Sequence, residues 1–134
     1  QWLISSFERR TGIKTQFRTS SESLSPATAI QLTAYRTAQE ALTNISKYAN
    51  CTLVQVDISD AEDFLTLEVS DNGVGISEQE RTKIDAFGIR GLHERARSVG
   101  GWLDVSSRKG VGTSVILSVP LREQTQNSLE GKFK

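Results

Sequence analysis

The segment Asp71-Asn72-Gly73-Val74-Gly75-Ile76 directly follows a run of alternating apolar and polar residues over 64–70. The alternation predicts a strand with one face toward the core, and three apolar residues occupy that face: Leu65, Leu67 and Val69. Asp71 continues the same phase, so we expect its carboxylate to point inward, where a carboxylate needs a polar partner. Gly73 and Gly75 allow the backbone to adopt positive φ or to approach a ligand closely. The segment therefore indicates either the floor of a pocket for a small polar ligand or a β-turn centred on Asn-Gly.

The composition excludes several classes of protein. The 134 residues suit one domain, and the 16 basic and 16 acidic side chains cancel, which argues against binding to nucleic acid or to a membrane surface. The chain has one cysteine, Cys51, and one histidine, His93, so neither an internal disulfide nor a zinc site is expected. No apolar run approaches the length of a membrane span. These features suit a cytoplasmic domain.

Two helices and several strands are expected around this segment. Ser25-Pro26 predicts the start of the longest helix and Asn50 its end. The apolar stripe of this helix comprises Ile30, Ala34, Tyr35, Ala38, Ala41, Leu42, Ile45 and Ala49. A second amphipathic helix is expected over 89–99, with Ile89, Leu92, Ala96 and Val99 toward the core. A capping box over 77–80 indicates a further short helix.

The strands are expected over 13–19, 52–58, 64–71, 102–107 and 113–119, and the last four form two antiparallel hairpins. Hairpins combined with amphipathic helices predict an α+β fold, a two-layer α/β sandwich whose mixed, mostly antiparallel sheet carries its helices on one face. The chain starts inside a helix-like pattern that stops at Thr11-Gly12, which suggests a piece of a longer protein. Residues 122–134 are polar and are expected to be a disordered tail.

Three glycine-bearing segments flank the second helix, over 71–76, 88–92 and 110–113. Glycines at the start of a helix expose backbone N–H groups, which suits a phosphate. On the longest helix, Glu40 and Asn44 offer oxygens that Mg²⁺ accepts, and Lys47 offers a positive charge to phosphate. These features together indicate a site for a nucleoside triphosphate. The alternative is that the three helix residues form an ordinary solvated face.

The sequence resembles the catalytic ATP-binding domain of bacterial two-component sensor histidine kinases. Residues 40–49, which read Glu-Ala-Leu-Thr-Asn-Ile-Ser-Lys-Tyr-Ala, look like the N box of that family, and residues 71–76 look like the G1 box. Residues 88–92 with 94–96 and 100–101 resemble the G2 region, and residues 110–113 resemble the final glycine-threonine turn. The wording over 39–44 is most similar to the nitrate/nitrite-sensor and degradation-sensor branch. Four motifs in the right order are much more specific than a lone glycine motif.

The resemblance implies the GHKL (Bergerat) ATP-binding fold, which gyrase, the Hsp90 chaperone and MutL-type repair proteins share. It implies that Asp71 binds the adenine amino group and that Asn44 holds Mg²⁺. It also implies that Glu40 polarises the attacking nucleophile and is a further metal ligand, either directly or through a water molecule. The other residues implied in binding ATP are Lys47, Tyr48, Gly73, Gly75, Ile76, Gly88, Ile89, Gly91, Leu92 and Thr113. Lys47 would contact the phosphates, Tyr48 the adenine or ribose, Ile76 the base, and Gly88 and Gly91 the phosphates and lid.

Three positions depart from the family pattern. Tyr48 stands where this branch usually has histidine, and Ala86 stands where the G2 box often has its first glycine. The phosphoacceptor histidine is missing, because His93, the single histidine, lies within the second helix and is expected on the helix surface. We therefore expect the acceptor on a separate upstream dimerisation domain, with residues 1–12 as the end of its helix or linker and residues 13–121 as the ATP-binding domain.

The resemblance implies a protein-histidine kinase that binds Mg·ATP and transfers the γ-phosphoryl group to that separate histidine. The partners implied are the upstream dimerisation domain and a response regulator. The isolated chain is expected to be monomeric with very low activity, and the whole protein a homodimer with membrane anchoring left open. Two alternatives are an ATP-hydrolysing conformational switch of the same fold, with Glu40 as base, and a degenerate module that only binds partners.

Overall fold

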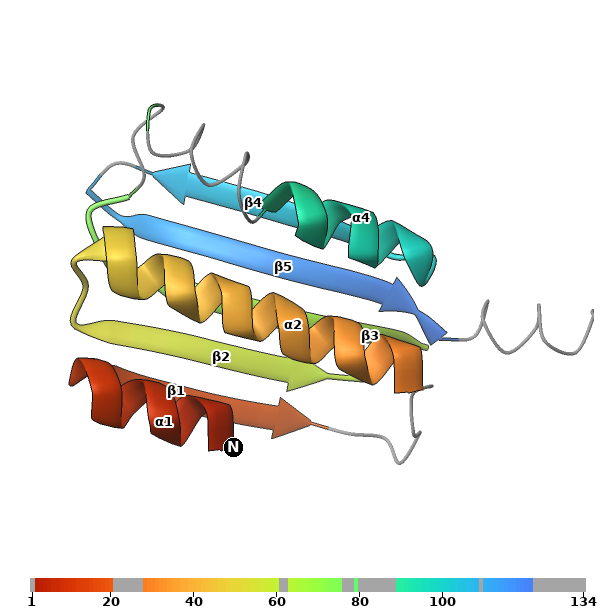
Figure 1. Cartoon of the computed structure of the whole chain (residues 1–134), viewed down its shortest axis with the longest axis horizontal. Coiled ribbons are helices and arrows are strands. Elements are labelled where there is room, and N and C mark those ends of the chain that lie inside the picture. Colours follow the sequence, from red (N-terminus) through yellow and green to blue (C-terminus); the bar gives the residue numbers. More distant parts are fainter. Residues whose placement is uncertain are drawn as a thin grey trace, which may run out of the picture.

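A five-stranded sheet with helices on one of its faces forms the fold (Figure 1). The computed structural model describes residues 2–20, 28–60, 63–75, 79, 89–108 and 110–121, without the side chains of Tyr48 and Ala49. In chain order the elements are α1 (Trp2–Thr11), β1 (Lys14–Ser20), α2 (Thr28–Asn44), the π-helical turn η1 (Ile45–Ala49), β2 (Leu53–Ser59), β3 (Phe64–Asp71), α4 (Arg90–Ser98), β4 (Trp102–Arg108) and β5 (Gly112–Pro120).

The strands lie in the order β1-β2-β3-β5-β4. Strands β1 and β2 are parallel, and every other neighbouring pair is antiparallel. Both predicted hairpins, β2–β3 and β4–β5, are therefore confirmed, and the parallel pair is the one that the long helix α2 connects. The predicted mixed, mostly antiparallel sheet is also confirmed.

One face of the sheet packs against the helices to form the core. Strand β3 contributes the three inward residues that the alternation predicts, and strands β2, β4 and β5 contribute Val54, Val56, Leu103, Val115, Leu117 and Val119. The opposite face carries Phe64 and Trp102, whose rings meet edge to face with centroids 6.0 Å apart. Both of these rings are exposed. One covered and one open face confirm the predicted two-layer architecture.

Helix α2 buries two threonines that the apolar pattern did not include. Thr33 and Thr37 face the core, and each hydroxyl donates a hydrogen bond to the carbonyl oxygen four residues earlier, at 2.9 and 2.8 Å. This bond satisfies the hydroxyl inside the helix, so the methyl group can pack like a valine. Tyr35, which the pattern placed on the stripe, is 42% exposed and lies at its edge. The predicted start at Ser25-Pro26 lies outside the described residues.

Helix α1 packs against the sheet through Phe7, which is completely buried. The predicted stop is confirmed, because Gly12 adopts a φ of 74° and donates its N–H to the carbonyl oxygen of Glu8 at 2.8 Å. The Glu8 carboxylate then accepts the backbone N–H of Thr15 at 3.0 Å. These contacts fix α1 to the start of β1, while the domain boundary at residue 12 stays a prediction.

Helix α4 buries all four residues predicted for its core face: Ile89, Leu92, Ala96 and Val99. The helix ends just before Gly100, the predicted stop, which has a φ of 79°, and the N–H of Gly101 donates to the carbonyl oxygen of Ala96 at 2.8 Å. The capping box over 77–80, apart from Gln79, and the tail from residue 122 lie outside the described residues. Within the described ranges, no helix is long and apolar enough to cross a membrane.

Candidate functional site

The Asp71 carboxylate lies at the end of β3, opposite Val54 of β2, and is partly buried. Its Oδ1 accepts the backbone N–H of Gly73 at 2.8 Å, so the carboxylate closes a tight Asx turn. Burial raises the pKa of Asp71, and the backbone N–H groups of Gly73 and Thr113, which favour the carboxylate, offset part of this rise. The backbone of this segment thus forms a turn, one of the two structures predicted for it. The Asp71 carboxylate is at the same time held in a partly desolvated position.

The β4–β5 turn braces this loop from the neighbouring strand. Gly110 donates its N–H to the carbonyl oxygen of Val74 at 2.9 Å. Gly112 has a φ of 136°, and a Cβ at this position would clash with the carbonyl oxygen of Asp71 and lie 2.9 Å from its carbonyl carbon. Thr113 is buried, and its hydroxyl lies 2.9 Å from the Ser107 hydroxyl. The turn can approach the loop this closely only because residue 112 has no side chain.

Asn72 fastens the loop to the start of β2. Its side-chain oxygen accepts the backbone N–H groups of Thr52 and Leu53 at 3.1 and 3.0 Å, and its amide donates to the Thr52 hydroxyl at 3.1 Å. The backbone N–H of Asn72 also donates to the carbonyl oxygen of Leu53 at 3.2 Å. Sequence reasoning missed this positioning residue, because its partners lie about twenty residues earlier and only the pairing of β2 with β3 reveals them.

Cys51 is a second neighbour that the sequence did not connect to the loop. It is partly buried and packs against the hydrophobic core. Burial and, to a lesser extent, the nearby Asp71 charge raise the pKa of its thiol. The thiol therefore lies in the electrostatic field of Asp71 and stays protonated at neutral pH.

The last turn of α2 and the helical turn that follows it carry the polar residues predicted for metal and phosphate. Glu40 and Asn44 are partly buried and Lys47 is exposed. The chain then forms the π-helical turn η1, which contains Lys47 and Tyr48 and ends at Asn50 with a left-handed φ of 47°. Single π turns within helices are rare, and those that occur are often found at functional sites. This end of α2, the loop after β3 and the β4–β5 turn all lie at the left end of the domain in Figure 1.

The start of α4 carries several residues predicted to bind ATP, and two of them also belong to its predicted core face. Ile89 and Leu92, expected among the ATP-binding residues, are 3% and 4% exposed and belong to the hydrophobic core. Gly91 is exposed, with open space beside it, whereas Gly73 and Gly75 are buried. Ile76 and Gly88 lie outside the described residues. The structure thus describes the other ten of the twelve predicted ATP-binding residues, Tyr48 by its backbone alone.

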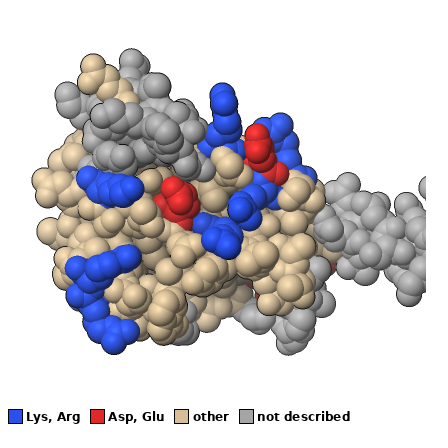
Figure 2. Space-filling view, viewed as in Figure 1, with Lys and Arg blue, Asp and Glu red and all other residues tan. Residues whose placement is uncertain are grey.

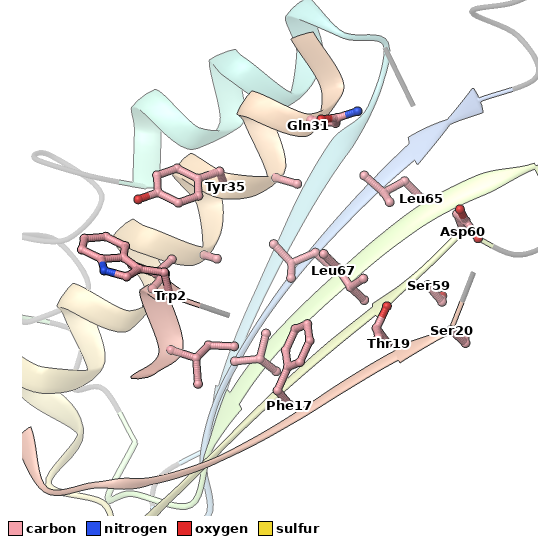
Figure 3. Close-up of a pocket in the computed structure, with 16 residues that line it drawn as sticks. Trp2, Phe17, Thr19, Ser20, Gln31, Tyr35, Ser59, Asp60, Leu65 and Leu67 are labelled. Carbon is pink, nitrogen blue, oxygen red and sulfur yellow. The ribbon is translucent and has the colours of Figure 1, made fainter. Parts of the chain in front are cut away.

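An apolar cavity of about 530 Å³ lies at the other end of the domain, between α1, the first half of α2 and the strands β1–β3. Figure 3 shows Phe17 and Leu67 at its centre, with Trp2 and Tyr35 on one side and Thr19, Ser59 and Asp60 on the other. Its lining includes none of the residues predicted to bind ATP. The cavity exists partly because α2 presents two small side chains to it, Ala34 and Ala38. It is therefore separate from the Asp71 loop.

Comparison with known proteins identifies relatives of this chain. Residues 29–123 match the family model of the histidine kinase-, DNA gyrase B- and HSP90-like ATPases (HATPase_c). The chain is 35% identical over 117 residues to the oxygen sensor histidine kinase NreB of Staphylococcus carnosus, a match that covers 87% of this chain and 34% of NreB. It is 30% identical over 118 residues to the signal transduction histidine-protein kinase/phosphatase DegS of Brevibacillus brevis, covering 88% of this chain and 30% of DegS. The chain thus spans about a third of the length of these relatives.

Solved structures support the same fold. The histidine kinase domain of the blue-light activated histidine kinase EL346 from Erythrobacter litoralis superposes with a TM-score of 0.74 at 22% sequence identity. The match covers 92% of this chain and 59% of that one. The predicted GHKL architecture is therefore confirmed. By its sequence match and its fold, the chain belongs to the HATPase_c family and is homologous to the sensor histidine kinases NreB and DegS.

Proposed function

We propose that this chain is the catalytic ATP-binding domain of a sensor histidine kinase, which binds Mg·ATP and transfers the γ-phosphoryl group to a histidine on a separate dimerisation domain. The observation that carries the proposal is the Asp71 carboxylate, held partly buried at the end of β3 by backbone N–H groups of Gly73 and Thr113. A hydrogen-bond acceptor fixed in this way suits the exocyclic amine of adenine. Guanine presents a carbonyl oxygen at the same ring position, which the carboxylate would repel.

The loop around Asp71 has the rigidity that such recognition needs. Asn72 ties it to β2 on one side and the Gly110–Gly112 turn supports it on the other. A preorganised acceptor loses little conformational freedom when the ligand binds, so more of its hydrogen-bond energy contributes to affinity. The bracing by two neighbouring strands therefore supports Asp71 as the residue that selects the base.

The residues at the end of α2 suit a magnesium ion bound together with phosphate. Mg²⁺ in phosphate sites is usually held by one or two protein oxygens, with water and the substrate supplying the others. Asn44 and Glu40 offer that number of oxygens, and the described residues contain no cluster of three or more acidic, histidine or cysteine side chains that would hold a metal alone. Bound there, the ion would neutralise charge on the transferring phosphoryl group. Lys47, exposed on η1, would add a mobile positive charge beside it.

The proposal assigns chemistry mainly to positioning and charge, since phosphoryl transfer leaves little covalent work to the protein. Glu40, one helical turn before Asn44, would orient the acceptor imidazole and accept its proton. The acceptor, the dimeric state and the response regulator belong to the whole protein, of which NreB and DegS are relatives about three times as long. For the isolated chain we propose nucleotide binding without self-phosphorylation.

The test is incubation with γ-labelled ATP and Mg²⁺, alone and together with the histidine-bearing dimerisation domain of the same protein. The proposal expects no label on this chain and label on the added domain, removed by Asn44→Ala. Label on His93, or rapid steady-state release of phosphate without an acceptor, would contradict it. A binding measurement with ATP and GTP shows in parallel whether the pocket selects adenine.

A further inference from the structure

A polar cleft of about 530 Å³ lies between α4 and the edge strand β4. Its lining comprises Ile89, Arg90, His93, Arg97, Leu103, Asp104 and Val105. Only Ile89 is among the residues expected to bind ATP, and its side chain is buried in the core. The proposed function therefore gives this cleft no role.

Basic side chains outnumber acidic ones in the lining of the cleft. Arg90, His93 and Arg97 follow one another at spacings of three and four residues, so they share one stripe of the helix. Figure 2 shows basic side chains over the region of α4, with acidic atoms lying among them. Within the described part of the chain none of the three forms an ion pair or a side-chain hydrogen bond, and the lining contributes a single acidic residue, Asp104. Three side chains that can donate hydrogen bonds thus line a concave space in which the only acidic side chain of the described residues is Asp104.

We propose that this cleft binds a compact, multiply charged anion of the phosphate-ester class, at a site separate from the nucleotide pocket. Guanidinium groups match the oxygens of a phosphate with two parallel hydrogen bonds, and His93 supplies a further N–H. The cleft has the volume of a small-molecule site, which favours a compact ligand over the flat surface of an acidic protein. Leu103 and Val105 form an apolar wall that an organic group attached to the phosphate would contact.

The single histidine makes the proposal directly measurable. Because His93 is the only histidine, its ring-proton resonances in a tag-free chain report on the cleft without further assignment. We would titrate inorganic pyrophosphate into the chain and follow these resonances by proton NMR, with sodium chloride at matched ionic strength as the control for screening. Arg97→Gln removes one charge from the cleft. Arg95→Gln removes the same charge from the same helix at an exposed position outside the lining.

The proposal predicts a saturable shift of the His93 resonances with pyrophosphate and none with sodium chloride. Arg97→Gln should weaken the apparent affinity for pyrophosphate about tenfold, because one hydrogen-bonded charge is lost. Arg95→Gln should leave this affinity within about twofold of that of the natural chain. A shift that does not saturate, that sodium chloride reproduces, or that both variants weaken equally would overturn the proposal. The proposed ATP site at the Asp71 loop is tested separately, by comparing the binding of ATP and GTP, so either proposal can fail without the other.

Discussion

Gly112→Ala tests how the loop at Asp71 is held. Gly112 has a φ of 136°, a conformation that residues with side chains rarely adopt, and its α-carbon approaches the Asp71 backbone so closely that a Cβ has no room. The neighbour that would have to move is the Asp71 carbonyl group, which is backbone and therefore cannot rotate away like a flexible side chain. The substitution should push the loop after β3 and the start of β5 apart.

The expected loss in unfolding free energy has two parts. The backbone strain costs about 1–3 kcal/mol, and the steric overlap costs about 1–3 kcal/mol more. The sum of about 2–6 kcal/mol is a large share of the roughly 5–15 kcal/mol that stabilises a typical domain. Gly110→Ala is the matched control, because Gly110 also has positive φ, at 80°, but open space surrounds it, so only about 1 kcal/mol is expected.

Urea unfolding of the three proteins measures both losses, and calorimetric titration with Mg·ATP measures the functional effect. We expect Gly112→Ala to lower the unfolding free energy by at least about 1 kcal/mol more than Gly110→Ala. It should also weaken ATP binding at temperatures where the variant remains folded. Equal losses for the two variants, or unchanged ATP affinity in folded Gly112→Ala, would refute the bracing of the loop by the β4–β5 turn.

Three further changes follow from the structure. Ala38→Leu should fill part of the apolar cavity and raise the unfolding free energy by about 0.5–2 kcal/mol, whereas Ala41→Leu, in the packed core outside that cavity, should lower it by about 1–3 kcal/mol. Thermal unfolding compares the two variants, and an equal loss of stability in both would contradict a cavity beside Ala38. Asp71→Asn should gain stability relative to the natural chain as the pH rises above 3.8, because the pKa of Asp71 is raised in the folded state and its ionisation therefore destabilises the folded natural chain. Denaturant unfolding at several pH values measures the unfolding free energy of both proteins. An advantage of the variant that shrinks as the pH rises would contradict the raised pKa. Asn72→Ala removes three solvent-exposed side-chain hydrogen bonds that tie the loop to β2, so the unfolding free energy should fall by roughly 1–3 kcal/mol and hydrogen exchange at Thr52 and Leu53 should accelerate; unchanged exchange at these two amides would show that Asn72 does not hold the loop.

Local patterns predicted the elements that bury one face. The alternation in β3 and the four-residue core face of α4 appear in the structure as the sequence indicates. Periodicity succeeds in these elements because side chains on a strand or helix segregate by burial. It failed for Thr33 and Thr37, because their hydroxyls are satisfied by the helix backbone and they pack as apolar residues.

Contacts between distant segments could not be predicted in the same way. The glycine at 112 was recognised as part of a turn, but its close approach to Asp71 depends on β5 lying beside β3, which only the strand order shows. The bonds from Asn72 to β2 and the π-helical turn at Ile45–Ala49 also depend on tertiary packing. The cleft beside His93 needs α4 and β4 together, so a residue expected on the helix surface became part of a concave site.

Calorimetric titration of Mg·ATP into the natural chain and into Asp71→Asn tests most directly whether Asp71 selects the adenine base of ATP. The substitution preserves shape but replaces one acceptor oxygen with a donor amide, which would oppose the amine of adenine. We predict binding by the natural chain and at least about tenfold weaker binding by the variant, with both proteins equally folded. Equal affinity in the two proteins would mean that Asp71 does not contact the base, and the account of the site would be wrong.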